Sequence, residues 1–157
     1  MTANELTKKI HQGIPLTQAM AFDITELTET SIAVITGGEE NVNVHGTAFA
    51  GSLYTTCVLA AWGLVNSRLP EEASLVLASG QIDYLSPVVG DICARGEIPK
   101  QDFEQFLTAV NKQSRSRLDV EIQVEHEGVL AAKFTGQVHA RIKQGGWKNG
   151  SRCDSTD

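Results

Sequence analysis

The spacing of hydrophobic and polar residues changes several times along this chain, and each change marks an expected element. Residues 117–125 alternate strictly, with polar residues between the apolar positions Leu118, Val120, Ile122 and Val124. This alternation predicts a β-strand with one face in solvent. Glu127-Gly128 then predicts a tight turn, and residues 129–142 are expected to form the partner strand.

Comparable patterns predict the remaining elements. Apolar residues at three- and four-residue spacing indicate two helices, at residues 4–12 and 101–110. Short segments rich in β-branched residues and bounded by glycine, proline or polar residues indicate four strands, at residues 20–27, 31–36, 75–85 and 91–98.

The segment from about Thr47 to Ser67 differs from all others because it contains no charged residue. A helix that is hydrophobic on every side must be buried. A membrane span of roughly 20 apolar residues is the alternative. The hydroxyl groups of the segment and its lack of flanking basic residues favour a helix buried inside the protein. The element order therefore predicts an α+β domain, in which a mostly antiparallel sheet of five to six strands wraps one long central helix.

Composition narrows the possible partners. The 157 residues fit one domain, expected at residues 1–144, followed by a Gly/Ser/Asn/Asp-rich tail at residues 145–157 that is expected to be disordered. A net charge of −6 argues against a nucleic-acid partner and against docking on an anionic membrane. No signal-peptide pattern occurs in the first ten residues, so a cytoplasmic location is expected.

The three cysteines indicate no metal site. Cys57, Cys93 and Cys153 are far apart, and no Cys-x-x-Cys pair exists. Cys57 and Cys93 have apolar neighbours and are expected to be reduced core residues, which suits the cytoplasm.

The entry to the uncharged helix carries the candidate chemistry. Amides of a first helical turn lack intrahelical partners, and the helix dipole favours negative charge there, so an anion or a carbonyl oxygen could bind. Gly46 permits close approach, and its amide or that of Thr47 is expected to begin the helix. His45 could position a substrate or handle a proton, or could be a structural loop residue. Asn43 could orient water or a carbonyl group, or could cap the helix.

These residues also carry a resemblance to a known family. The run Asn43-x-His45-x-Thr47-x-Phe49-Ala50-Gly51-Ser52-Leu53-Tyr54, with Ala61-Trp62-Gly63, resembles a bacterial thioesterase family of the hotdog fold, the YiiD C-terminal type. That domain follows an acetyltransferase domain in some proteins and stands alone in others; no acetyltransferase domain fits in this chain. Ile82-x-Tyr84-x-x-Pro87-Val88-x-Gly90-Asp91 adds a pattern common among hotdog proteins.

The resemblance implies a homodimer with sheets joined edge to edge, a site at the interface, and dimers that could pair further. It implies an acyl-CoA or acyl carrier protein substrate and no separate cofactor, since CoA or phosphopantetheine belongs to the substrate. Catalytic roles fall on His45, Gly46 and Asn43. Thr47 and Ser52 could contact the ligand, or could serve as caps and packing groups.

The chain departs from many hotdog thioesterases in lacking a carboxylate on the helix. The corresponding position is near Tyr54, which could donate a hydrogen bond or only pack. Asp83, from this chain or from a partner, is the candidate general base; a solvated strand residue is the alternative. Lys112, Arg115 and Arg117 could contact CoA phosphates, or could form a solvated strand entry.

The leading interpretation is an acyl-thioester hydrolase in which water attacks while the helix N-terminus holds the oxyanion. The missing carboxylate supports a second interpretation, a non-catalytic acyl-CoA binding or regulatory domain. A hotdog dehydratase or isomerase is a third, and it is weakened most by the missing acid.

Overall fold

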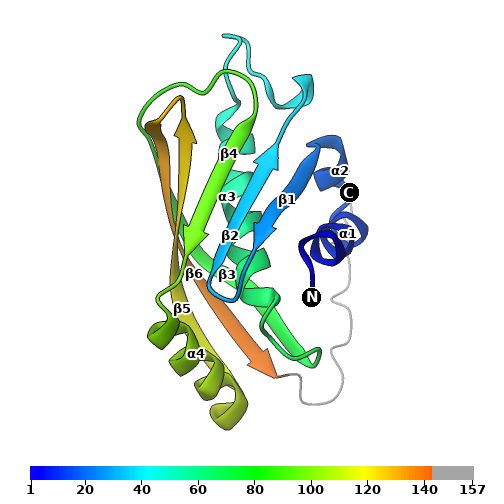
Figure 1. Cartoon of the computed structure of the whole chain (residues 1–157), viewed down its shortest axis with the longest axis vertical. Helices are drawn as coiled ribbons and strands as arrows, with labels where there is room; N and C mark the ends of the chain where they lie inside the picture. Colours follow the sequence, from blue (N-terminus) through cyan, green and yellow to red (C-terminus); the bar gives the residue numbers. More distant parts are fainter. Residues whose placement is uncertain (143–157) are drawn as a thin grey trace, which may run out of the picture.

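Six strands form a single antiparallel sheet in the order β1-β2-β4-β5-β6-β3 (Figure 1). This computed structural model describes residues 1–142, so the tail expected at residues 145–157 lies outside the described residues. The strands are β1 (Phe22–Leu27), β2 (Ser31–Thr36), β3 (Ala73–Tyr84), β4 (Ile92–Glu97), β5 (Arg115–His126) and β6 (Val129–Ile142). The sequence prediction of a mostly antiparallel sheet of five to six strands is confirmed.

The helices are α1 (Ala3–Gly13), α2 (Leu16–Ala19), α3 (Ala50–Asn66) and α4 (Lys100–Gln113), with a 3₁₀ turn at Glu39–Asn41. At the start of α1, the Thr2 hydroxyl accepts from the Glu5 amide and the Glu5 carboxylate accepts from the Thr2 amide. This reciprocal capping explains why the helix begins there. The sequence analysis missed α2 and the 3₁₀ turn, both too short to display a helical period.

The hairpin of β5 and β6 follows the alternating pattern closely. Val120, Ile122 and Val124 are buried, while the odd-numbered residues between them face solvent. Glu127 and Gly128 both have positive φ, 50° and 74°, as a tight two-residue hairpin turn requires. The predicted turn and both predicted strands are confirmed.

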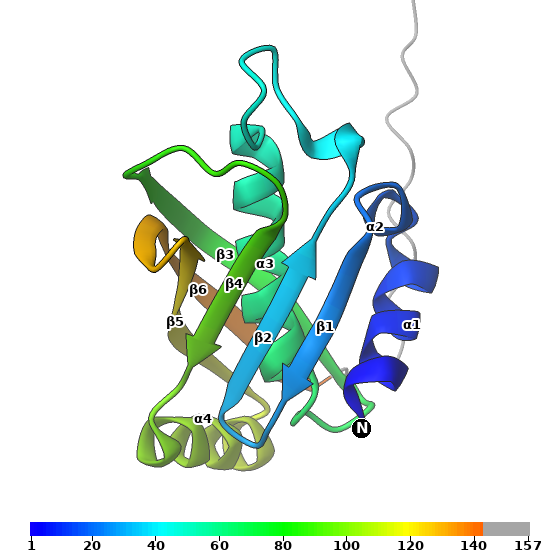
Figure 2. The same ribbon diagram turned by 45° about the horizontal axis from the view of Figure 1, so that its top comes forward.

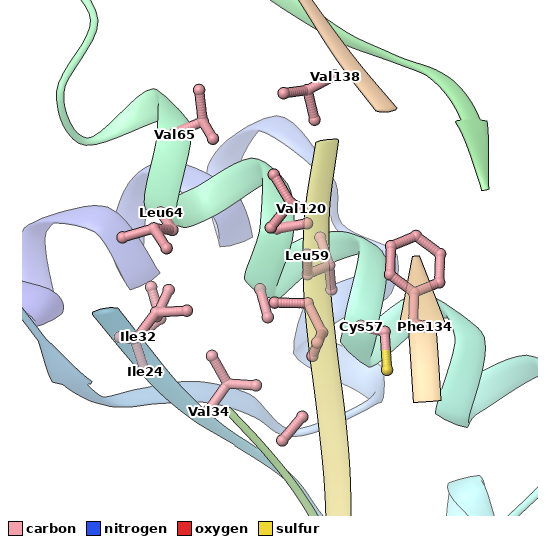
Figure 3. Close-up of a cluster of buried hydrophobic side chains, with 14 of the residues drawn as sticks. Ile24, Ile32, Val34, Cys57, Leu59, Leu64, Val65, Val120, Phe134 and Val138 are labelled. Carbon is pink, nitrogen blue, oxygen red and sulfur yellow. The ribbon is translucent and has the colours of Figure 1, made fainter. Parts of the chain in front are cut away.

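Helix α3 lies against the inner face of the sheet and forms the centre of the core (Figure 3). Cys57, Leu59, Leu64 and Val65 of this helix pack among apolar side chains of the strands, including Ile32, Val34, Val120, Phe134 and Val138. The buried, uncharged helix is therefore confirmed. Within residues 1–142, no helix is long and apolar enough to cross a membrane.

One side of α3 is not covered by the sheet. Gly51, Tyr54, Thr55, Val58 and Trp62 are only half-buried, and their spacing of three to four residues places them in one stripe. Trp62 donates its indole N–H to the Leu75 carbonyl of β3 at 3.1 Å. Because β3 is an edge strand, the stripe lies beside a strand edge that no other strand of residues 1–142 covers.

Two local predictions are wrong. Helix α3 begins at Ala50 and not at Thr47, because residues 43–47 close a hydrogen-bonded turn and Phe49 is still extended (φ −63°, ψ 133°). Cys93 is exposed, although Cys57 is buried as expected. In β4 the neighbours Ile92 and Ala94 point into the core, so alternation places Cys93 on the outer face.

Candidate functional site at the start of the central helix

The loop of residues 37–49, which joins β2 to α3, projects beyond one end of the sheet (Figure 2). Its side chains reach solvent: His45 and Phe49 are exposed, and Val44 is 95% exposed. A bridge between Val42 and Ala48 closes its base. The predicted site residues 43–47 therefore lie together in one protruding turn that leads into the buried helix.

Asn43 organises this turn. Its Oδ1 accepts the amides of His45 at 2.8 Å and Thr47 at 3.2 Å. Its Nδ2 donates to Thr47 Oγ1 at 2.9 Å and to the Ala48 carbonyl at 3.3 Å. Because these bonds use its donors and acceptors, the Asn43 side chain is occupied in the turn and does not cap α3.

Gly46 and Thr47 do not contribute amides to the first turn of the helix. The Gly46 amide donates to the Asn43 carbonyl at 3.0 Å, and Asn43 Oδ1 accepts the Thr47 amide. Gly46 has φ +77°, a conformation that favours glycine. The expectation that either amide begins the helix is therefore wrong, and the glycine instead allows the chain to turn and expose His45.

The first turn of α3 has no side-chain cap. Leu53 is the first residue whose amide reaches the N-cap, donating to the Phe49 carbonyl at 3.0 Å. The amides of Ala50, Gly51 and Ser52 precede it, and such amides have no intrahelical acceptor. Ala50 is exposed and Gly51 half-buried, whereas Ser52 is 7% exposed. The amides of Ala50 and Gly51, which belong to residues that are not buried, are therefore the candidate donors to a ligand.

Two tyrosines flank this helix start. Tyr84 of β3 donates its hydroxyl to the Ala50 carbonyl at 2.9 Å. Tyr54 packs edge-on against Phe134, with ring centroids 5.5 Å apart. Its hydroxyl lies over Gly80 of β3, where a Cβ atom would be only 2.5 Å from it. Because Gly80 has no side chain, the Tyr54 ring fits against β3 at the helix position where the sequence lacks a carboxylate.

Burial near the helix start favours the neutral forms of Cys57 and Tyr84. Burial raises the pKa of the Cys57 thiol to about 12, so it remains protonated at neutral pH. Desolvation, followed by the nearness of Cys57 and Tyr54, raises the pKa of Tyr84 above its ordinary value. Since both pKa values are raised, Tyr84 and Cys57 are uncharged at neutral pH and neither supplies a general base.

The structure does not bring Asp83 to the helix start. In β3, Ile82 and Tyr84 face α3, so Asp83 points to the opposite, outer face, where Lys133 of β6 is its cross-strand neighbour. Ser52 also faces away from the open stripe: it is one turn before Thr56, whose hydroxyl bonds Thr36 of β2 at 2.9 Å. Strand alternation thus turns Asp83 away from the site, and the helical period turns Ser52 toward the sheet.

The predicted basic residues lie at the other end of the molecule. Lys112 is in the last turn of α4, and Arg115 and Arg117 open β5, far from the projecting loop (Figures 1 and 2). The strand register places Arg141 opposite Arg115 and His139 opposite Arg117. Sequence analysis missed these two residues because only the pairing of β5 with β6 brings them together.

Chemically, this region offers amide donors at the helix start, an exposed imidazole in the preceding loop and a tyrosine hydroxyl, while α3 itself carries no carboxylate. Such donors can stabilise an oxyanion, and an imidazole can direct or deprotonate water. Among residues 1–142, no group of three or more His, Cys, Asp or Glu side chains could hold a metal ion.

Solved structures share this architecture over most of their length. A protein of unknown function from Chlorobaculum tepidum TLS is 25% identical, with a TM-score of 0.83 over 90% of this chain and 94% of that one. A "putative thioesterase" from Shewanella oneidensis is 26% identical, with a TM-score of 0.74 over 90% and 97%. A Pseudomonas aeruginosa protein with 17% identity and a TM-score of 0.80, over 91% and 97%, shows the fold alone.

Thioesterases of the hotdog fold are thus the structural neighbours of this chain, as the resemblance implied. The family model described as "Putative thioesterase (yiiD_Cterm)" matches residues 3–141, which include every helix and nearly the whole sheet. The chain therefore belongs to this YiiD C-terminal thioesterase family.

Proposed function

We propose that this protein hydrolyses an acyl thioester, with CoA or a carrier protein as the thiol, at a site formed by the start of α3 and a second copy of the chain. The observation that carries the proposal is the uncapped first turn of α3, whose Ala50 and Gly51 amides follow the turn that exposes His45. Family membership supports the thioesterase chemistry.

In the proposed reaction, the thioester carbonyl points at the amides of Ala50 and Gly51. Water attacks the carbonyl carbon, and the negative charge that develops on its oxygen is stabilised by these amides and by the helix dipole. His45 directs the water or takes its proton. The C–S bond then breaks, and the thiolate leaves with a proton to give a carboxylic acid and a free thiol.

Asn43 is a positioning residue in this scheme, since its side chain holds the turn that presents His45. Thr47 supports the same turn as a hydrogen-bond partner of Asn43. Tyr54 contacts the substrate through its hydroxyl, which lies on the open stripe of α3. Gly46 supplies the positive φ that the turn needs, in place of the oxyanion contact expected from the sequence.

We propose a second copy because one edge of strand β3 lacks a partner strand within residues 1–142. The strand has twelve residues, of which Asp83 alone is charged. Long, weakly charged edges invite pairing with another strand. Exposed apolar side chains surround this edge and the helix start: Phe49, Val76, Tyr84, Leu85 and Val89 are each at least half exposed. A second copy paired through β3 would cover them together with the open stripe of α3.

The direct test is release of free thiol from a panel of acyl-CoAs. We expect saturable hydrolysis by the wild-type protein, and a fall of about 10²-fold in kcat for His45→Ala, since loss of a positioned acid–base group has about this effect. Val44→Ala is the matched control, because Val44 is the adjacent loop residue and is 95% exposed. Equal rates for wild type and His45→Ala would refute the role of His45.

One observation favours a second candidate, a non-catalytic acyl-CoA binding domain. Helix α3 carries no carboxylate, and Asp83 points to the outer face. Saturable binding of acyl-CoA with no thiol release from any member of the panel would favour this candidate over the hydrolase.

A further inference from the structure

Four basic side chains meet on the outer face of the sheet, at the end opposite the projecting loop. Arg115 and Arg117 of β5 stand directly opposite Arg141 and His139 of β6. Directly opposed residues of antiparallel strands point to the same face, with Cβ atoms about 5 Å apart. Their neighbours in the register, Ser116 and Ala140, face inward, so all four basic side chains face outward. We call these four residues the basic patch.

The arginines of the patch are not neutralised by ion pairs within residues 1–142. Arg117 donates to the Gln137 side chain at 3.3 Å, and Gln137 in turn donates to Asp119. Arg115 and Arg141, although directly opposed, have no carboxylate within salt-bridge distance in this part of the chain. Opposed like charges destabilise a strand pair, and this chain has a net charge of −6. A bound anion would remove that cost.

The same two arginines line a surface pocket of about 400 Å³, together with Gln113, Ser114 and Ile142. Ser114 adopts the left-handed conformation, φ 62°, where α4 ends and β5 begins. Another pocket on the outer face, about 470 Å³, has carboxylates along its lining: Glu26, Glu97, Glu121 and Glu125. Carboxylates outnumber Arg95 in that pocket, so of these two pockets the one lined by Arg115 and Arg141 suits an anion.

An antiparallel pairing of two copies through β3 would bring the patch to the same end of the joined sheet as the helix start of the other copy, with the patch on the outer face and α3 on the inner face. Within one chain, the patch lies beside Ser74, where β3 begins, whereas the helix start lies beside Tyr84, where β3 ends. The ten steps along the strand from Ser74 to Tyr84 span roughly 33 Å at about 3.3 Å per residue. If two β3 strands pair antiparallel, the Ser74 end of one copy lies beside the Tyr84 end of the other.

We propose that Arg115, Arg117, His139 and Arg141 bind the phosphorylated nucleotide half of a CoA thioester whose acyl group occupies the site of the partner copy. Guanidinium groups match phosphate oxygens as planar, two-pronged donors, and CoA carries a diphosphate and a ribose 3′-phosphate. Lys112, in the last turn of α4, adds positive charge nearby but does not line the pocket. The identity of the ligand as CoA rests on the proposed function; the affinity for phosphate groups does not.

The binding experiment uses adenosine 3′,5′-bisphosphate and calorimetry, so that no turnover is needed. We expect the wild-type protein to bind it, and the double variant Arg115→Gln/Arg141→Gln to bind about tenfold more weakly or worse, since charged hydrogen bonds are lost. The double variant Arg115→Lys/Arg141→Lys should retain part of the affinity. The control is Arg95→Gln, which removes one positive charge from an outer-face arginine that lies near Glu26. Equal affinity of wild type and the double glutamine variant would overturn the proposal.

The kinetic arm compares acyl-CoA with the acyl-pantetheine that has the same acyl group and no nucleotide. The glutamine double variant should raise KM for acyl-CoA about tenfold with little change in kcat, and should leave acyl-pantetheine unaffected. Equal losses on both substrates would overturn the proposal, because a folding defect or an effect on the acyl site would then be the cause. If neither substrate is hydrolysed while the bisphosphate still binds, the proposed function is refuted and the phosphate site stands.

A competition experiment with inorganic phosphate tests whether the site recognises the nucleotide or only a phosphate group. Displacement of the bisphosphate by inorganic phosphate at similar concentrations would overturn nucleotide recognition.

Discussion

At the scale of single residues, the direction of a side chain decides its role more than its chemistry does. Asp83 has the carboxylate that thioester hydrolysis could use as a base, yet it lies on the face of β3 away from α3. Tyr84, one residue later, reaches the Ala50 carbonyl at the helix start. A shift of one position in a strand exchanges the two faces of a sheet.

This geometry predicts that Asp83 is dispensable for catalysis. Asp83→Asn should leave kcat and KM within about twofold of wild type, because surface substitutions away from a site have small effects. Steady-state thiol release, measured on the same acyl-CoA as for His45→Ala, checks this expectation. A loss of activity comparable to that of His45→Ala would show that catalysis depends on the Asp83 carboxylate.

The identities of several site residues could be predicted from sequence, but their contacts could not. The sequence predicts candidate site residues between Asn43 and Thr47, and these residues do form the turn ahead of α3. The partner of each amide in that turn depends on backbone angles, such as φ +77° at Gly46. Residue types alone do not specify them, so the helix start was placed three residues too early.

At the scale of elements, the uncharged helix and the alternating strands were predictable because burial fixes their periods. The open stripe of α3 was not predictable. Val58 and Trp62 are as apolar as the buried residues of the same helix, so hydrophobicity along it is nearly uniform. Only the position of β3 at the edge of the sheet shows which side of α3 remains open.

The edge strand is therefore the element whose alteration should separate two copies. Val76→Lys with Ser79→Lys places two positive charges on exposed positions of β3, a device that natural edge strands use against pairing. We expect a monomer by light scattering, with thiol release from acyl-CoA reduced at least about tenfold because the partner's part of the site is lost.

Thr135→Lys is the matched control for the edge variant. Thr135 is exposed on the same outer face but belongs to β6, an internal strand, where it stands opposite Gln81. It should leave the oligomeric state unchanged. An edge variant with the mass and activity of the wild-type protein would contradict pairing through β3.

At the scale of the whole molecule, the proposed pairing of two copies through β3 would join two separated features into one site. The helix start with His45 lies at one end of the sheet, and the basic patch lies at the other (Figure 2). An antiparallel pair of copies would place each patch at the same end of the joined sheet as the other copy's helix start, on the opposite face. The acidic net charge of the chain gives no sign of this arrangement, since it averages over carboxylates and arginines that occupy different regions of the outer face.

The central claim is that the first turn of α3 holds the thioester carbonyl. It is tested most directly by a crystal structure of the protein with a non-hydrolysable acyl-CoA analogue that retains the carbonyl group. We predict the carbonyl oxygen within hydrogen-bond distance of the Ala50 and Gly51 amides, about 2.9 Å, with His45 facing the carbonyl carbon. A carbonyl group bound elsewhere, with both amides left in contact with solvent, would contradict the account.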